Sequence, residues 1–240
     1  MLCNAGVVSP RKVDPTARAT LIEIGARLLA SEGPQTLSTR RIAKEAGSST
    51  MAVYTHFGGM DGLVREIVHE GFARLEKHLN QVQKTDDPVA DMGVLGRAYR
   101  ANAQANPHLY TVMFGGSSLA GFELTDDDRQ YGRYTLTTVI DCANRCVQAG
   151  RFRPGDPVLH SHHMWLATHG LINLELGDYL IDPWDADTCY ESQLIALMVG
   201  AGDALEAATR SVELSAERFI TEIEHGPERP TGPPQSNTLS

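Results

Sequence analysis

The stretch from Leu37 to Leu63 reads LSTRRIAKEAGSSTMAVYTHFGGMDGL and holds the signals for two short helices joined by a tight turn. The Ser38 hydroxyl can accept a hydrogen bond from the free amides that open a helix. Ile42 and Ala43 then follow at positions typical of one buried helical face. Gly47 tolerates the left-handed conformation that ends a helix and reverses the chain. The pattern predicts a helix that begins directly after Ser38 and stops at a corner.

A second short helix is expected beyond this corner. Ser49 can cap it, and Val53 and Phe57, which are four residues apart, would face the core together. Its opposite side carries small and polar side chains together with Tyr54. A short helix that is held by its neighbours and carries donors on its free face has the dimensions to enter the major groove of DNA. The stretch therefore predicts a helix-turn-helix.

The pattern resembles the DNA-binding domain of the TetR family of transcriptional regulators. That domain has an alanine-glycine turn, then a serine, an aliphatic-tyrosine pair and a histidine-phenylalanine pair, here Ala46-Gly47, Ser49, Val53-Tyr54 and His56-Phe57. The resemblance implies two sets of DNA contacts: phosphate contacts from Thr39, Ser49, Tyr54 and His56, and base contacts from Thr50 and Met51, with Thr55 able to serve either. The alternative is that Tyr54 and His56 only pack within an all-helical domain.

The chain departs from the family pattern at the start of the next helix. Gly59 and Met60 stand where the family has a small capping residue and a lysine. The lysine would contact a phosphate, so the departure implies a weaker grip on the DNA backbone.

Charge is distributed unevenly along the chain. The net charge of the 240 residues is -9. Residues 1–58, however, carry seven Lys and Arg against four Asp and Glu, which gives +3, and the remaining residues carry 14 against 26, which gives -12. Phosphate binding depends on local positive charge, so a basic head on an acidic body would present the head to DNA.

Other features of the composition exclude several classes of protein. No apolar run reaches the roughly 18 residues that a membrane-spanning helix needs, and residues 1–10 lack the features of a secretion signal. The four cysteines lack the paired spacing of a zinc site. We therefore expect a cytoplasmic protein without membrane contact, bound metal or cofactor.

Apolar periodicity between glycine and proline breaks predicts helices throughout and no strand, so the expected fold is all-α with about nine helices. Single long helices are expected over Asp126–Ala149 and from Ala186 to about Val212. The expected domains are a flexible arm at 1–13, a three-helix DNA-binding domain at 14–58, a helical bundle for ligand binding and dimerisation at 59–225, and a disordered tail at 226–240.

The body of the chain carries a second resemblance. Trp165 precedes His169-Gly170 by four and five residues, and Leu174-Glu175 follows. This resembles a regulatory-domain type of the TetR family named for its Trp-His-Gly residues, as does the segment Asn106–Phe114. In that family the last two long helices pair with those of a second subunit. The resemblance implies a homodimer, and the small residues at 200–202 would permit close helix contact.

The resemblance also implies a small-molecule effector bound between the helices of the body, and such sites are commonly lined by aromatic side chains with few polar groups. The candidates are Tyr99, Phe114, Tyr134, Trp165 and His169. Each alone could equally be a core residue. A ligand would favour a dimer whose two reading helices are wrongly spaced for successive major grooves, and so release a palindromic operator.

We therefore expect the protein to be a repressor and not an enzyme. Several alternatives to this interpretation remain. Four histidines, His160, His162, His163 and His169, suggest metal sensing, but none of them forms the i, i+4 pair that binds a metal on one helix. Cys142 and Cys146 are i, i+4 and suggest redox sensing, although buried free thiols are more common. An enzyme that uses the histidine-rich helix is a further alternative, but the sequence lacks a nucleophile elbow, a glycine-rich phosphate loop and a paired-carboxylate signature, so no reaction can be named. An architectural DNA binder without an inducer is the remaining alternative.

Overall fold

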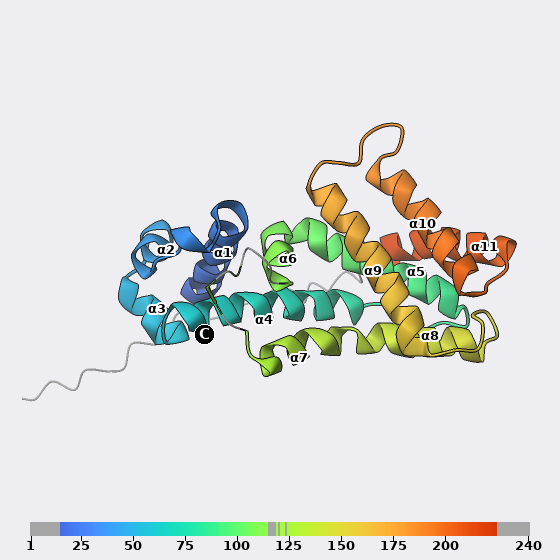
Figure 1. Ribbon diagram of the computed structural model, residues 1–240, viewed down its shortest axis with the longest axis horizontal. Helices are drawn as coiled ribbons and strands as arrows, with labels where there is room; N and C mark the ends of the chain where they lie inside the picture. Colours follow the sequence, from blue (N-terminus) through green and yellow to red (C-terminus); the bar gives the residue numbers. More distant parts are fainter. Residues whose placement is uncertain (1–14, 115–118, 120, 123, 225–240) are drawn as a thin grey trace, which may run out of the picture. The chain divides into compact units, whose positions relative to one another are not determined.

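The computed structural model describes residues 15–114, 119, 121–122 and 124–224. This part of the chain holds eleven α-helices and no β-strand, which confirms the all-α prediction (Figure 1). The helices are α1 (Pro15–Glu32), α2 (Thr39–Glu45), α3 (Thr50–Phe57), α4 (Met60–Leu79), α5 (Pro88–Ala105), α6 (Pro107–Met113), α7 (Asp126–Thr135), α8 (Thr137–Gln148), α9 (Pro157–Leu176), α10 (Ala186–Ala201) and α11 (Leu205–Phe219). A 3-10 turn, η1 (Pro34–Thr36), follows α1, and a π-helical turn, η3 (Ile220–Glu224), follows α11. The predicted arm and tail lie outside the described residues.

The helix predicted over Asp126–Ala149 is wrong in one respect, because the chain divides it into α7 and α8. The Thr135 hydroxyl donates to the Gly132 carbonyl at 2.7 Å, and the Leu136 amide bonds to Arg133, three residues back, at 3.1 Å. A threonine that bonds to the preceding turn competes with the backbone ladder and bends the helix.

The helix predicted from Ala186 to about Val212 is also divided, into α10 and α11. Gly202 has a φ of 123°, and a Cβ at this position would lie 2.7 Å from the backbone nitrogen of Arg153. That nitrogen donates to the carbonyl of Ala201 at 2.9 Å. Gly202 therefore ends α10 where the segment near Arg153 crosses it. The lack of a side chain at Gly202 makes room for this contact, which lies within one chain.

Contacts divide the chain into two compact units. One unit comprises residues 1–72 and 106–131, and the other comprises residues 73–105 and 132–240. Helices α1 to α3 therefore cluster with α6 and with the first parts of α4 and α7. The functional boundary after residue 58 stays a prediction.

The core of the first unit explains why its short helices are rigid. Leu21 and Leu28 of α1, Ile42 of α2, Val53 of α3 and Ile67 of α4 have no solvent exposure. Burying one such side chain contributes about 1.5–3 kcal/mol, which a seven- or eight-residue helix needs because it is marginal alone. Packing on α1 and on each other therefore holds α2 and α3 in place.

Helix α5 is the centre of the second unit and packs on α8, α9 and α11. It is buried on nearly every side, as a central helix must be. Gly93 allows α11 to approach closely, because a Cβ there would lie 2.5 Å from the hydroxyl of Ser215. At the start of α5, the buried carboxylate of Asp91 accepts hydrogen bonds from Arg145 of α8 at 2.7 Å and from Arg218 of α11 at 2.6 Å.

Asp91 remains charged despite its burial. Burial opposes ionisation, but hydrogen bonds from Thr85, Arg218 and Arg145 outweigh it and hold the pKa of the carboxyl below its ordinary value of 3.8. Because the folded state lowers this pKa, the stabilisation is present at neutral pH and is lost as the pH falls through the folded-state pKa.

We expect Asp91→Asn to lower the free energy of unfolding by about 3 kcal/mol at pH 7, because it leaves two guanidinium groups without their shared anion. The difference from wild type should begin to shrink as the pH falls below 3.8 and should vanish once the pH falls through the lower folded-state pKa, because the wild-type carboxylate is then protonated as well. Urea unfolding followed by circular dichroism measures both values. Asp86→Asn, at an exposed position five residues earlier, is the control, and equal midpoints for the two variants would contradict the role of Asp91.

Candidate nucleic-acid interface and ligand site

The corner between α2 and α3 is formed by local hydrogen bonds, as the sequence predicts. The Ser38 hydroxyl accepts from the Arg41 amide at 3.2 Å. Gly47 has a φ of 59°, and the Ser48 amide donates to the Ala43 carbonyl at 2.8 Å. These features confirm the predicted start of α2 and the glycine turn. Ser49 occupies the N-cap position of α3, but its side chain makes no capping hydrogen bond.

The outer face of α3 is open to solvent. Met51 and Tyr54 are 67% and 52% exposed, whereas Val53 on the opposite face is completely buried. The structure brings six of the seven predicted DNA-contacting residues together on α3 and its N-cap, and the seventh, Thr39, begins α2. The exposed members are Ser49, Thr50, Met51, Tyr54 and Thr55, and Thr39 and His56 are half-buried.

The end of α3 is fixed directly to α4. Gly58 has a φ of 73°, and its amide donates to the Tyr54 carbonyl at 2.9 Å. In the first turn of α4, a Cβ at Gly62 would overlap the carbonyl oxygen of Phe57. Only glycine allows this approach, so the backbones of α3 and α4 are in direct contact. Sequence reasoning missed the role of Gly62, although three glycines in five residues were a signal.

Ion pairs join α2 to α1. Arg41 binds Glu32 of α1 at 2.7 Å and Glu45 of its own helix at 3.1 Å, and Arg27 of α1 also binds Glu45. The hydrogen bonds that Arg41 donates to the carboxylates of Glu32 and Glu45 raise the pKa of Arg41. These pairs are well solvated, so each contributes little to stability. Their main consequence is that Arg27 and Arg41 are occupied by carboxylates.

Two further cations of α2 are better placed to bind a phosphate. Arg40 and Lys44 are exposed, and neither forms an ion pair with any carboxylate that the structure describes. Sequence reasoning counted the basic residues of the head but did not separate these two from the paired ones. The separation requires knowing which glutamates lie nearby in space.

Three of the five predicted ligand residues meet in the second unit. The indole N–H of Trp165 on α9 donates to the hydroxyl of Tyr99 on α5 at 3.2 Å. The same hydroxyl lies 3.4 Å from Nδ1 of His169, one turn further along α9. Burial lowers the pKa of His169 from its ordinary value of 6.5, so the imidazole is neutral at pH 7. The cluster therefore joins aromatic surface to a chain of uncharged hydrogen-bonding groups.

The other two predicted ligand residues have different surroundings. Phe114 belongs to the first unit, where its ring meets those of Phe72 and Tyr110 edge-on at 5.7 and 5.5 Å. Tyr134 lies near the end of α7 and is exposed. Their roles in ligand binding stay predictions.

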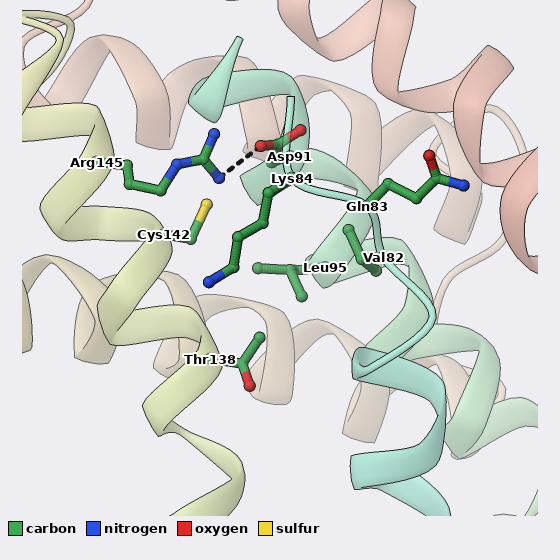
Figure 2. A pocket seen from close by; sticks show the side chains of 8 residues that line it. All are labelled: Val82, Gln83, Lys84, Asp91, Leu95, Thr138, Cys142 and Arg145. Carbon is green, nitrogen blue, oxygen red and sulfur yellow. Dashed lines mark hydrogen bonds and ion pairs between the residues drawn. The ribbon is translucent and has the colours of Figure 1, made fainter. Parts of the chain in front are cut away.

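A small pocket in the second unit lies beside Asp91 and Arg145 (Figure 2). Figure 2 shows the Lys84 side chain lying across it, between Cys142 and Leu95. Its volume of about 20 Å³ has room for about one water molecule and not for an organic effector.

The thiols and histidines give little support to the alternative sensors. A hydrogen bond with Cys142, together with burial, raises the pKa of Cys146, which disfavours the thiolate needed for redox chemistry. Nδ1 of His162 bonds to the carbonyl of Val158 at 2.7 Å, and the ring of His160 packs on Phe152. The described residues contain no group of three or more His, Cys, Asp or Glu side chains arranged to hold a metal ion.

Among the helices that the structure describes, none is both long enough and apolar enough to cross a membrane.

Comparison with known families identifies the class of protein. Residues 21–67 match the family described as "Bacterial regulatory proteins, tetR family". Residues 94–197 match "Tetracyclin repressor-like, C-terminal domain". The two matches together cover more than half of the chain, and they include both the α2–α3 corner and the Trp165 cluster. The chain belongs to the TetR family.

Individual relatives agree with this assignment. An HTH-type transcriptional regulator of Mycobacterium tuberculosis is 29% identical over 137 residues, which are 55% of this chain and 56% of that protein. The nucleoid occlusion factor SlmA of Aliivibrio fischeri is 30% identical over 114 residues, which are 45% of this chain and 56% of SlmA. The match thus spans little more than half the length of these relatives.

A solved structure shows the same fold. A bacterial regulatory protein of the tetR family from Rhodococcus RHA1 superposes with a TM-score of 0.66 at 17% identity. The superposition covers 80% of this chain and all of that structure.

Proposed function

We propose that this protein is a DNA-binding transcriptional regulator that reads a near-palindromic operator with α3. The observation that carries the proposal is a short helix whose inner face is buried and whose outer face is exposed. Val53 is fully buried, Gly62 brings α4 against the end of α3, and Tyr54 is half-exposed. A reading helix must be rigid and uncovered in this way to enter a major groove.

The residues of α3 suggest how DNA is read. In protein–DNA complexes, contacts to phosphates position the protein, and contacts to base edges specify the sequence. Thr39, Ser49, Tyr54 and His56 carry polar groups for phosphates, and Arg40 and Lys44 of α2 add charge. Thr50 and Met51 face outward from the first turn, and Thr55 could serve either role. The exposed face of α3 has no Arg, Asn or Gln, so methyl contacts and water must supply much of the selectivity.

The proposed regulator is a homodimer that pairs through α9 and α10, which lie side by side (Figure 1). On α9, Leu159, Leu166 and Leu174 are 56%, 59% and 48% exposed, and their spacing of seven and eight residues places them on one face. A Cβ at Gly170 on the same helix would meet no atom within 4 Å. Helix α11, in contrast, packs on α5. A second copy would cover the apolar face of α9.

The proposed effector is a small molecule that binds beside Trp165. With this site we also propose that the body is a regulatory domain of the Trp-His-Gly type. The cluster of Trp165, Tyr99 and neutral His169 supports both proposals. A ligand that competes for the Tyr99 hydroxyl would exchange one hydrogen bond for another at little net cost. Release from DNA would then follow from a shift toward dimers with wrongly spaced reading helices, so the protein would act as a repressor.

One relative favours a second candidate function. SlmA is named as a nucleoid occlusion factor, and its similarity to this chain is consistent with a DNA binder whose task is architectural. Such a protein would bind many sites and need no effector.

We expect Tyr54→Ala to weaken binding to operator and non-operator DNA alike, by about tenfold, because it removes a contact to the backbone. Thr50→Ala should instead change the preferred sequence at one position in each half-site, with an effect of about 1–3 kcal/mol between bases, the usual cost of one mismatched base pair. Fluorescence anisotropy with labelled duplexes measures both effects. Unchanged binding in both variants would refute this assignment of α3.

For the dimer, Leu166→Glu should convert the protein to a monomer, because two carboxylates would be buried on a shared apolar face. Light scattering coupled to size-exclusion chromatography gives the mass. Leu205→Glu is the control, because Leu205 is also exposed but begins α11. A Leu166→Glu protein that remains dimeric would eliminate this interface.

For the ligand site, a compound that raises the melting temperature of the wild-type protein should bind at least tenfold more weakly to Trp165→Phe. Screening a panel of metabolites by thermal shift finds the compound. The chain has two tryptophans, so Trp184→Phe leaves Trp165 as its single tryptophan, and the tryptophan emission should change as the compound binds. A Trp165→Phe variant that responds like wild type would exclude this pocket.

A further inference from the structure

Asp128, in the first turn of α7, binds two residues of α4. Its Oδ1 lies 2.8 Å from Nε2 of His69, and its Oδ2 accepts a hydrogen bond from Nε of Arg65 at 3.3 Å. Arg65 and His69 are four residues apart, so they share one face of α4. The ring of Tyr131, one turn further along α7, stacks on His69 with centroids 4.9 Å apart. Asp128, Arg65, His69 and Tyr131 form what we call the α4–α7 latch.

The same carboxylate also caps its own helix. The amide and hydroxyl of Thr125 donate to Oδ2 of Asp128 at 2.8 and 2.7 Å, and the Asp128 amide donates back to the Thr125 hydroxyl at 3.2 Å. This reciprocal arrangement is a capping box. Only 3% of the Asp128 side chain is exposed. One buried anion thus both starts α7 and attaches it to α4.

The electrostatics keep this anion charged. Burial opposes ionisation, but hydrogen bonds from Thr125 and His69 and the nearby charge of Arg65 hold the pKa of Asp128 below its ordinary value. Protonation of His69 would turn its hydrogen bond into an ion pair. The latch therefore needs the Asp128 carboxylate, and a neutral amide of the same shape cannot replace it.

The latch lies close to the points where α4 and α7 continue from the first unit into the second. Helix α4 begins in backbone contact with the end of α3 at Gly62, and Arg65 follows within one turn. Helices α4 and α7 both continue into the second unit, after Phe72 and Tyr131 respectively. His69 and Asp128 each stand three residues before these points. A movement of α7 in the first unit must therefore either carry α4 with it or break the latch.

We infer that Asp128 is a positioning residue that holds α4, and through it the reading helix α3, in the arrangement that fits an operator. The inference rests on the proposed function and adds to it the contact that couples the regulatory body to DNA binding. An effector that displaces α7 would act on α3 through this contact. Couplings of this kind typically change affinity by about 5–150-fold.

The experiment distinguishes a positioning role of Asp128 from a general loss of stability in the DNA-binding helices. Asp128→Asn keeps the shape of the side chain but removes the anion. Asp126→Asn is the matched control, because Asp126 lies in the same turn, is 95% exposed and pairs only locally with Arg129 at 3.2 Å. Anisotropy measures the affinity of each protein for a two-half-site operator, selected from random DNA by the wild-type protein, and for a duplex that carries a single half-site.

We expect Asp128→Asn to bind the two-half-site operator about tenfold more weakly and the single half-site with unchanged affinity, because only the first duplex requires correctly placed heads. The control should match wild type on both duplexes. His69→Leu should also weaken operator binding, and combining it with Asp128→Asn should cause no additional loss, since the two residues act as a unit.

Three results would overturn the inference. Equal losses on both duplexes would show that Asp128 only stabilises the head, and unchanged operator binding would show that the latch has no role in positioning. Additive losses in the double variant would show that His69 and Asp128 act separately. Failure of the wild-type protein to select any sequence from random DNA is a distinct outcome, because it would refute the proposed function itself together with the inference.

Discussion

The structure depends on one steric constraint, the absence of a side chain at Gly62. Because no Cβ is present, the first turn of α4 can lie against the carbonyl of Phe57, and α3 ends in backbone contact with the helix that follows it. An eight-residue helix is too short to be stable or rigid alone. Its burial through Val53 and its contact with α4 supply what its length does not. The exposed face of α3 can then be a surface of fixed shape.

Two successive contacts connect the reading helix α3 to α7. Helix α4 is in direct contact with α3, and one turn later the α4–α7 latch binds it to a second helix through Asp128. A second buried carboxylate, Asp91, joins three helices around α5 through Arg145 and Arg218. A protein built in this way can keep a stable body while small displacements near the latch change the direction of the reading helix.

Much of this architecture could be predicted from sequence, because its signals are local. The Ser38 cap, the Gly47 turn and the buried Val53 each depend on residues within a few positions of one another, and all appear in the structure. The uninterrupted helices predicted over Asp126–Ala149 and Ala186–Val212 were wrong, because a threonine side chain and a crossing segment near Arg153 end them. The link from His69 to Asp128 spans 59 residues, and no periodicity reveals it. Of the predicted ligand residues, a spacing of four joined Trp165 to His169, whereas nothing local indicated where Phe114 or Tyr134 would lie.

The central claim is that the exposed face of α3 reads duplex DNA, and sequencing the genomic fragments retained by the purified protein tests it most directly. The account predicts a small set of enriched fragments that share a near-palindromic motif, with half-sites spaced to suit the two reading helices of a dimer. Retained DNA that covers the genome evenly, without a shared motif, or no retained DNA at all, would contradict it.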